Sequence, residues 1–143
     1  MELNIEEFNI FRSVNKDLTR EDIQMMKPLN LAFIGDVVYE ILVRTEILNK
    51  NKNSHELHKI KSKIVSAKGQ AESLRKIEDS LTEDEKKIVN RASGAKYHTI
   101  PKNANLHDYR FASAFEALYG YLYLLGEDER ILELYNLGKE PTE

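Results

Sequence analysis

The sequence contains no cysteine, only three prolines and six glycines, and no long uninterrupted hydrophobic run. Without cysteine, a disulfide scaffold, a zinc–thiolate site and a thiol nucleophile are all excluded. The two most apolar stretches, residues 29–43 and 111–125, each span fifteen residues and contain a carboxylate, whereas a membrane-spanning helix needs about 20 apolar residues. The N-terminal MELNIEEFNI has two adjacent glutamates where a signal peptide has a basic start. We therefore expect a soluble, cytoplasmic protein.

The length and charge of the chain narrow its class further. Its 143 residues are enough for one compact domain and too few for a second independent core. The net charge is −3, but residues 50–102 contain 13 basic and 7 acidic residues, whereas the rest contains 8 and 17. A basic middle between acidic ends favours an anionic partner, although solvated helix surfaces have the same composition.

The scarcity of proline, glycine and alternating β-branched residues predicts an all-α fold. Helix-start residues and apolar spacing predict six helices. These helices begin at Thr19, at Pro28 (ending near Leu48), at Ser54, at the Thr82–Glu85 capping box, at about His107 (ending near Leu125) and at Asp128 (ending at Leu137, before Gly138).

Two further segments have different patterns. From Ser54 we expect one continuous helix, because an apolar stripe at three- and four-residue spacing runs to Leu74. Residues 93–105, SGAKYHTIPKNAN, are rich in turn-forming residues and predict a break. The first eighteen residues are compatible with a packed strap or with a short helix.

Two near-apolar helices each contain an isolated carboxylate. Asp36 lies in residues 29–43, and Glu116 lies in residues 111–125, where only Ser113 is otherwise polar. Helices of this composition are buried in a domain, and an unpaired charge there is expensive. A divalent cation shared between the two helices would satisfy both acids, and oxygen ligands favour Mg²⁺ or Mn²⁺. Alternatively, each acid lies at the exposed edge of its helix or caps a neighbouring element.

A third carboxylate and the histidines are weaker candidates. Glu40 lies one helical turn from Asp36 and is either a further ligand or an exposed residue. His55 and His58 are three residues apart but lack a third ligand, so we expect both on the surface.

The two acid segments resemble the ribonuclease III family. LNLAFIGDVVYEILV (residues 29–43) is similar to the signature helix that carries a metal-binding aspartate, and FASAFEALYGYLYL (residues 111–124) is similar to the second catalytic helix, which carries a metal-binding glutamate. Residues 55–74 resemble the helix between them. Residues Ala95–Asn103 resemble a loop of the Mini-ribonuclease III proteins. The resemblance covers roughly residues 20–138 and points to this small bacterial subfamily, whose members consist of the catalytic domain alone.

The resemblance implies a ribonuclease III-like helical endonuclease domain. It would span residues 1–143, with a core at about 20–138 and no separate double-stranded RNA-binding domain, and would work as a homodimer with much of helix 29–43 at the two-fold interface. The implied activity is Mg²⁺-dependent hydrolysis of phosphodiester bonds in double-stranded RNA, with Asp36 and Glu116 as catalytic residues and metal ligands. The implied task is maturation of precursor 23S ribosomal RNA, and a ribosomal protein is a candidate partner.

The basic middle of the chain supplies candidate RNA-binding residues, because double-stranded RNA is held largely through its phosphates and 2′-hydroxyls. Lys61 and Lys68 are seven residues apart and share one helix face, and Arg91, Lys96 and Lys102 bracket the predicted break. For each of these residues taken alone, a solvated surface charge is the alternative.

The sequence also departs from full-length ribonuclease III enzymes, which have acids where this chain has Leu29, Ala32 and Ser113. The subfamily resembles this chain in lacking them, which implies a site of two carboxylates per subunit completed by water and phosphate oxygens. The alternative function is a non-catalytic RNA- or ribosome-binding module on the same fold. Such a module would be expected to lose Asp36 or Glu116, and this chain has both.

Overall fold

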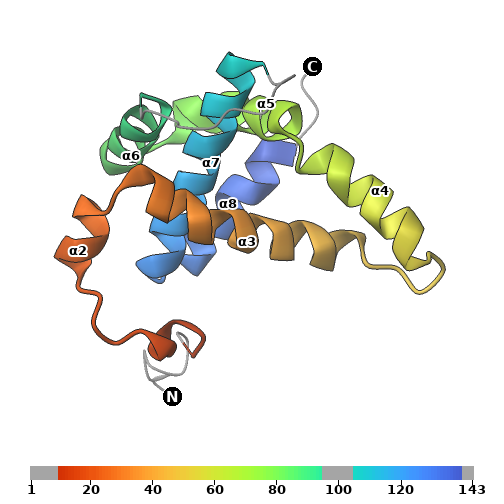
Figure 1. Ribbon diagram of the computed structural model, residues 1–143, viewed down its shortest axis with the longest axis horizontal. Helices are drawn as coiled ribbons and strands as arrows, with labels where there is room; N and C mark the ends of the chain where they lie inside the picture. The colour runs from red at the N-terminus through yellow and green to blue at the C-terminus, as the bar shows by residue number, and fades with distance from the viewer. Residues whose placement is uncertain (1–9, 95–104, 140–143) are drawn as a thin grey trace.

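The structure is a computed structural model that describes residues 10–94 and 105–139 (Figure 1). Within these ranges every regular element is a helix and none is a strand, as the sequence predicts. The elements are η1 (Arg12–Val14), α2 (Arg20–Met25), α3 (Pro28–Ile47), α4 (Ser54–Ile64), α5 (Ala67–Ile77), η2 (Glu78–Ser80), α6 (Glu83–Ser93), α7 (Leu106–Leu124) and α8 (Asp128–Lys139).

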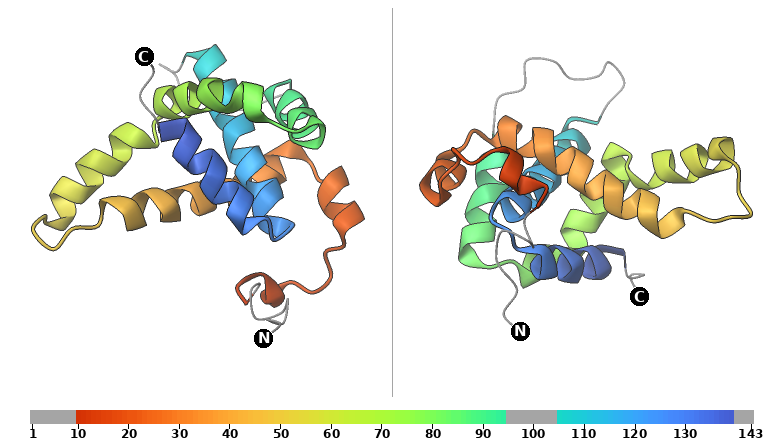
Figure 2. Two further views of the ribbon diagram at one scale, coloured as in Figure 1. Left: turned by 180° about the vertical axis from the view of Figure 1, so that it is seen from behind. Right: turned by 90° about the horizontal axis from the view of Figure 1, so that it is seen from below.

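Helix α7 forms the centre of the fold, with α3, α5, α6 and α8 packed against it (Figures 1 and 2). Ten of its nineteen residues are buried. Phe115 and Tyr119 of α7 surround the ring of Tyr39 from α3, with centroid separations of 4.8 and 5.2 Å. The prediction that residues 111–125 form a buried helix is therefore confirmed.

Local chemistry sets most of the helix starts. Thr19 and Thr82 each accept a hydrogen bond from the backbone N–H three residues later, and the acid at that position bonds back to the threonine N–H. These reciprocal bonds satisfy two otherwise unpaired N–H groups at each helix start. Pro28 occupies the first turn of α3 as expected.

The expectation of one continuous helix from Ser54 to Leu74 is wrong, because the chain turns at Val65 and Ser66. Ser66 caps α5 by accepting a 3.1 Å hydrogen bond from the N–H of Gly69. A Cβ atom at Gly69 would lie 2.4 Å from the carbonyl oxygen of Ile64, so only glycine fits this turn. At the start of α4, the cap is Asn53 and not Ser54.

The end of the last helix also differs from the expectation. Helix α8 continues through Gly138 to Lys139. Gly138 is buried, and a Cβ atom there would lie 3.4 Å from Cβ of Ser73 on α5. A Cβ atom at this position would therefore make an ordinary van der Waals contact with α5, and α8 continues because Gly138 is packed against that helix.

The predicted break at residues 93–105 lies mostly outside the described residues, which resume at Asn105. Asn105 caps α7 by accepting hydrogen bonds from two backbone N–H groups. Near the other end of the chain, Arg12 pairs with Asp128 at 2.7 Å and its guanidinium lies 4.6 Å from the centre of the Tyr123 ring. These contacts attach the described part of the N-terminal segment to α7 and α8. In the described part of the chain, no helix combines the length and apolar character needed to cross a bilayer.

Candidate active site

Two glycines bring α3 and α7 into backbone contact. A Cβ atom at Gly35 would lie 1.6 Å from the carbonyl oxygen of Glu116, and a Cβ atom at Gly120 would lie 1.9 Å from the carbonyl oxygen of Leu31. Neither position has room for any other residue. Neither glycine stands out in the sequence, because the contact that each one makes depends on how the two helices cross.

This crossing places Asp36 and Glu116 side by side. Asp36 follows Gly35 directly, and Glu116 is the residue whose carbonyl Gly35 contacts. The carboxyl group of Asp36 is close enough to Glu116 to be one of the causes of its raised pKa. The expectation that both acids are buried is wrong for Asp36, which is exposed, and Glu116 is half-buried. The pair therefore forms a patch that is open to solvent on the α3 side and enclosed on the α7 side.

The surroundings of Glu116 favour its protonated form. Burial, together with the proximity and the negative charge of the Asp36 carboxyl group, raises the pKa of Glu116 to about 9. Glu40 contributes a smaller effect in the same direction. In the absence of a cation, Glu116 is thus neutral at pH 7.

The chemistry of this pair fits a divalent cation. Two adjacent carboxyl groups present hard oxygen ligands, and a bound cation would offset the repulsion between their charges. No cluster of three or more His, Asp or Glu side chains forms a metal site among residues 10–94 and 105–139. A ligand set drawn from Asp36 and Glu116 would consist of two carboxylates, and Mg²⁺ suits few protein ligands because it retains several water molecules.

Glu40 matches neither of its two predicted roles, because it is not fully exposed and its carboxylate is paired with two cations instead of with Asp36 and Glu116. Its Oε1 atom accepts hydrogen bonds from Nε and Nη2 of Arg44 at 3.1 and 2.8 Å. The same atom lies 3.0 Å from Nζ of Lys61 on α4. These two cations hold the pKa of Glu40 below its usual value. The four-residue spacing of Glu40 and Arg44 is enough to predict their ion pair within the helix. The contact of Glu40 with Lys61 depends on the tertiary fold.

The predicted RNA-binding residues lie in different environments. Lys61 is bonded to Glu40, and Lys68 is exposed in the first turn of α5. Arg91 donates hydrogen bonds to the carbonyl oxygens of Gln24 and Met26, so it holds the end of α2. Lys96 and Lys102 lie outside the described residues.

One face of α3 is apolar and exposed. Phe33 is 82 % exposed and Ile41 61 % exposed, in contrast to the expectation that residues 29–43 are buried all round within the domain. The exposed stripe of α3 consists of Leu29, Phe33, Val37 and Ile41. Beside it lies a groove of about 470 Å³, lined mainly by apolar side chains of α3 and α8.

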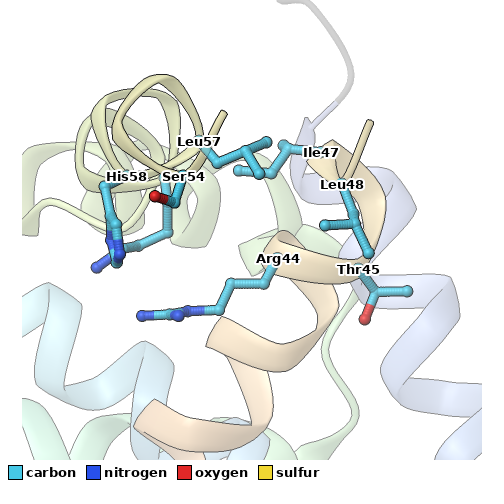
Figure 3. Close-up of a pocket in the computed structure, with 8 residues that line it drawn as sticks. Arg44, Thr45, Ile47, Leu48, Ser54, Leu57 and His58 are labelled. Carbon is cyan, nitrogen blue, oxygen red and sulfur yellow. The ribbon is translucent and has the colours of Figure 1, made fainter. Parts of the chain in front are cut away.

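His55 and His58 are both exposed, as predicted. His58 lines a second pocket of about 280 Å³ between α3 and α4, together with Arg44 and Lys61 (Figure 3). In this view Ile47 and Leu57 point toward each other, whereas Arg44 and His58 extend toward the same side.

Comparison with known proteins identifies the family. Residues 29–127 match the family model described as the ribonuclease III domain. The chain is 47 % identical to Mini-ribonuclease 3 of Thermoanaerobacter over 127 residues, which are 88 % of this chain and 89 % of the relative. It is 44 % identical to Mini-ribonuclease 3 of Clostridium tetani over 126 residues, or 87 % and 83 % of the two chains.

A solved structure agrees with the sequence relatives. The crystal structure of a Fusobacterium nucleatum protein superposes with a TM-score of 0.74 at 35 % identity, covering 81 % of this chain and 93 % of the other. The matched family region contains Asp36, Glu116 and both crossing glycines. The chain therefore belongs to the ribonuclease III family, in the branch formed by the Mini-ribonuclease 3 proteins.

Proposed function

We propose that this protein is a double-strand-specific endoribonuclease that hydrolyses phosphodiester bonds with a divalent cation, Mg²⁺ or alternatively Mn²⁺, held by Asp36 and Glu116. The observation that carries the proposal is the carboxyl pair at the α3–α7 crossing, which two glycines hold together in a member of this family. Asp36 and Glu116 are the proposed catalytic residues.

The chain's own residues have distinct parts in this reaction. A bound divalent cation supplies Lewis-acid polarisation of the scissile phosphate and makes a water molecule more acidic. Asp36, on the exposed side, and Glu116, on the enclosed side, would hold the cation together. Glu116 would bind it as a carboxylate, and the close contact of its backbone with Gly35 of α3 holds its helix beside Asp36.

The activity is tested with long double-stranded RNA, in Mg²⁺ and in EDTA. We expect cleavage by the wild type in Mg²⁺ alone, and a loss of roughly a hundredfold or more in Asp36→Asn and in Glu116→Gln. Glu46→Gln is the matched control, since Glu46 is an acid on the same helix that pairs with Tyr135 and Lys139 instead. If the wild type binds the duplex but does not cut it in Mg²⁺, the protein is an RNA-binding module.

We also propose that the protein acts as a homodimer through the exposed stripe of α3. A contiguous apolar surface of this kind is unusual on a monomer. The stripe lies next to the groove of about 470 Å³, into which an apolar side chain of a second copy fits. A two-fold arrangement would bury the stripe of each copy and place two carboxyl pairs on one assembly.

The proposed RNA surface includes Lys68, Lys96 and Lys102, whereas the two carbonyl hydrogen bonds of Arg91 support a structural role for that residue. We propose precursor 23S ribosomal RNA as the substrate, which would place the protein in the cytoplasm, with a ribosomal protein as a further partner. This part of the proposal rests on the subfamily resemblance. Cutting of a precursor 23S end in preference to a generic duplex of equal length would support it, and equal rates would count against it.

A further inference from the structure

Glu40 joins two helices on the side of α3 that carries Asp36. Asp36, Glu40 and Arg44 follow one another at four-residue spacing and therefore share one face of α3. The carboxylate of Glu40 lies 2.8 Å from Arg44 and 3.0 Å from Lys61 of α4. The side chains of Glu40 and Lys61 are only 25 % and 18 % exposed, so this ion pair is partly shielded from solvent.

Helix α4, to which Lys61 belongs, is attached to the fold mainly at its two ends, through the connection to α3 and through the tight turn into α5, where Ile64 is partly buried against the core. None of the eleven residues of α4, all of which the structure describes, is buried. Figure 1 shows α3 and α4 as the two arms of a V that meet near residues 48–53 and diverge toward α7. The pocket of about 280 Å³ lies between these arms, with Ile47, Leu48 and Leu57 at its apolar end (Figure 3). Apolar packing therefore holds the closed end of the V, and the partly buried Ile64 leads the open end of α4 into α5.

The Glu40–Lys61 pair crosses the V farther along both helices. Counting from the connection, Lys61 is one turn beyond His58, and Glu40 is one turn beyond Arg44 toward Asp36. An ion pair at this place restrains the angle between the arms more effectively than one near the connection, because a given change in angle moves the two side chains farther apart there. Helix α4 also carries Lys59 and Lys63, both exposed.

We propose that Glu40 is a positioning residue, which holds α4 through Lys61 so that the exposed lysines of α4 engage the same RNA duplex whose phosphate lies at Asp36 and Glu116. This inference rests on the proposed function and changes the role of Lys61 from an RNA contact to a structural anchor. It also separates Glu40 from the metal ligands, since two cations already neutralise its carboxylate.

Kinetic measurements test the role of the pair. Glu40→Gln, Lys61→Met and the double variant are compared in KM for a duplex, kcat at saturating duplex and the Mg²⁺ concentration for half-maximal rate. We expect each single variant to raise KM about tenfold with kcat within about twofold. The double variant should be no worse than either single one, because both remove the same contact. Glu46→Gln, which breaks a Glu–Lys pair elsewhere on α3, should leave KM unchanged.

Three results would overturn the inference. A large fall in kcat with a raised Mg²⁺ requirement in Glu40→Gln would identify Glu40 as a metal ligand. Additive effects of the two single variants on KM would identify Lys61 as an independent RNA contact. An unchanged KM in Glu40→Gln would show that the ion pair has no positioning role.

A distance measurement tests the geometry without relying on activity. Since the chain contains no cysteine, cysteines introduced at Lys59 on α4 and Glu129 on α8 accept spin labels at these positions alone. Both native residues are exposed. We expect a narrow distance distribution in the wild type and a broader or shifted one in Glu40→Gln, measured after dilution with unlabelled protein. Equal distributions would contradict the inference even if the protein cuts RNA, and a difference would stand even if it does not.

Discussion

Two acids that are shielded from solvent, Glu85 and Glu116, have opposite pKa shifts, which is the difference expected between an acid with a structural role and the proposed metal ligand. Burial alone would raise the pKa of Glu85, but hydrogen bonds from Arg130 at 3.0 and 2.8 Å and from the N–H of Thr82 outweigh it, so its pKa is lowered. Glu116 faces the carboxyl group of Asp36, and its pKa is raised. Glu85 is satisfied within the fold, whereas Glu116 is suited to an added cation.

The lowered pKa of Glu85 predicts a pH-dependent contribution to stability. Because the folded-state pKa lies below the unfolded value of about 4.5, the ion pair stabilises the protein fully above that value. The contribution is lost as the pH falls through the folded-state pKa. We expect Glu85→Gln to lower the free energy of unfolding by about 2 kcal/mol at pH 7, and by clearly less near pH 3.5, as measured by urea titration. Glu133→Gln removes an exposed partner of the same arginine and should cost less than about 0.5 kcal/mol. An equal loss for Glu85→Gln at both pH values would contradict this account.

At the scale of the helices, the decisive feature is the crossing of α3 and α7. Replacing glycine by alanine inside a helix usually stabilises it by about 1 kcal/mol. At Gly120 the added Cβ would lie 1.9 Å from the Leu31 carbonyl oxygen, which belongs to a backbone that cannot move aside. We expect Gly120→Ala to destabilise the protein by about 3 kcal/mol and to separate the two acids. Thermal unfolding measures the first effect, and cleavage of duplex RNA the second.

Gly94→Ala is the control for this prediction. Among the described residues, the nearest heavy atom that a Cβ atom at Gly94 would meet is 3.5 Å away, and the residue has an ordinary negative φ of −90°. We expect its stability to stay within about 1 kcal/mol of the wild type. If Gly120→Ala were equally harmless, the close approach of the two helices would not determine the site.

The helices also show what the sequence can and cannot predict. Starts governed by neighbouring residues, such as those at Thr19, Pro28 and Thr82, follow from local hydrogen-bonding chemistry and are confirmed. The break at Ser66 was missed because the apolar spacing stays in phase across it, and this hides a cap that uses Ser66 and Gly69. The ion pair of Glu40 with Lys61 joins residues 21 positions apart, and no local pattern predicts it.

At the scale of the whole molecule, the sequence shows which residues are apolar. It does not predict which of them are buried within one chain and which remain exposed. Residues 29–43 have the composition of a fully buried helix, yet α7 covers only one side of α3. The other side exposes Phe33 more than any other residue of the stripe. Two sequence motifs likewise predict the acids of the candidate site. They do not predict that Asp36 is exposed and Glu116 half-buried, which follows from how α3 and α7 cross. An apolar surface that one chain leaves exposed therefore predicts that the protein assembles through it.

The homodimer proposal therefore has a direct test. We expect the wild type to sediment at twice the mass of one chain at micromolar concentration, and Phe33→Glu to sediment as a monomer. A carboxylate at the centre of an apolar interface loses its hydration without gaining a partner, at a cost of several kcal/mol. Leu106→Glu is the control, since Leu106 is also exposed but lies at the start of α7, away from the stripe. It should remain dimeric. If the wild type sediments as a monomer, or if Phe33→Glu remains a dimer, this face of α3 binds another partner. A monomer that still cuts RNA would show that one carboxyl pair is sufficient for cleavage.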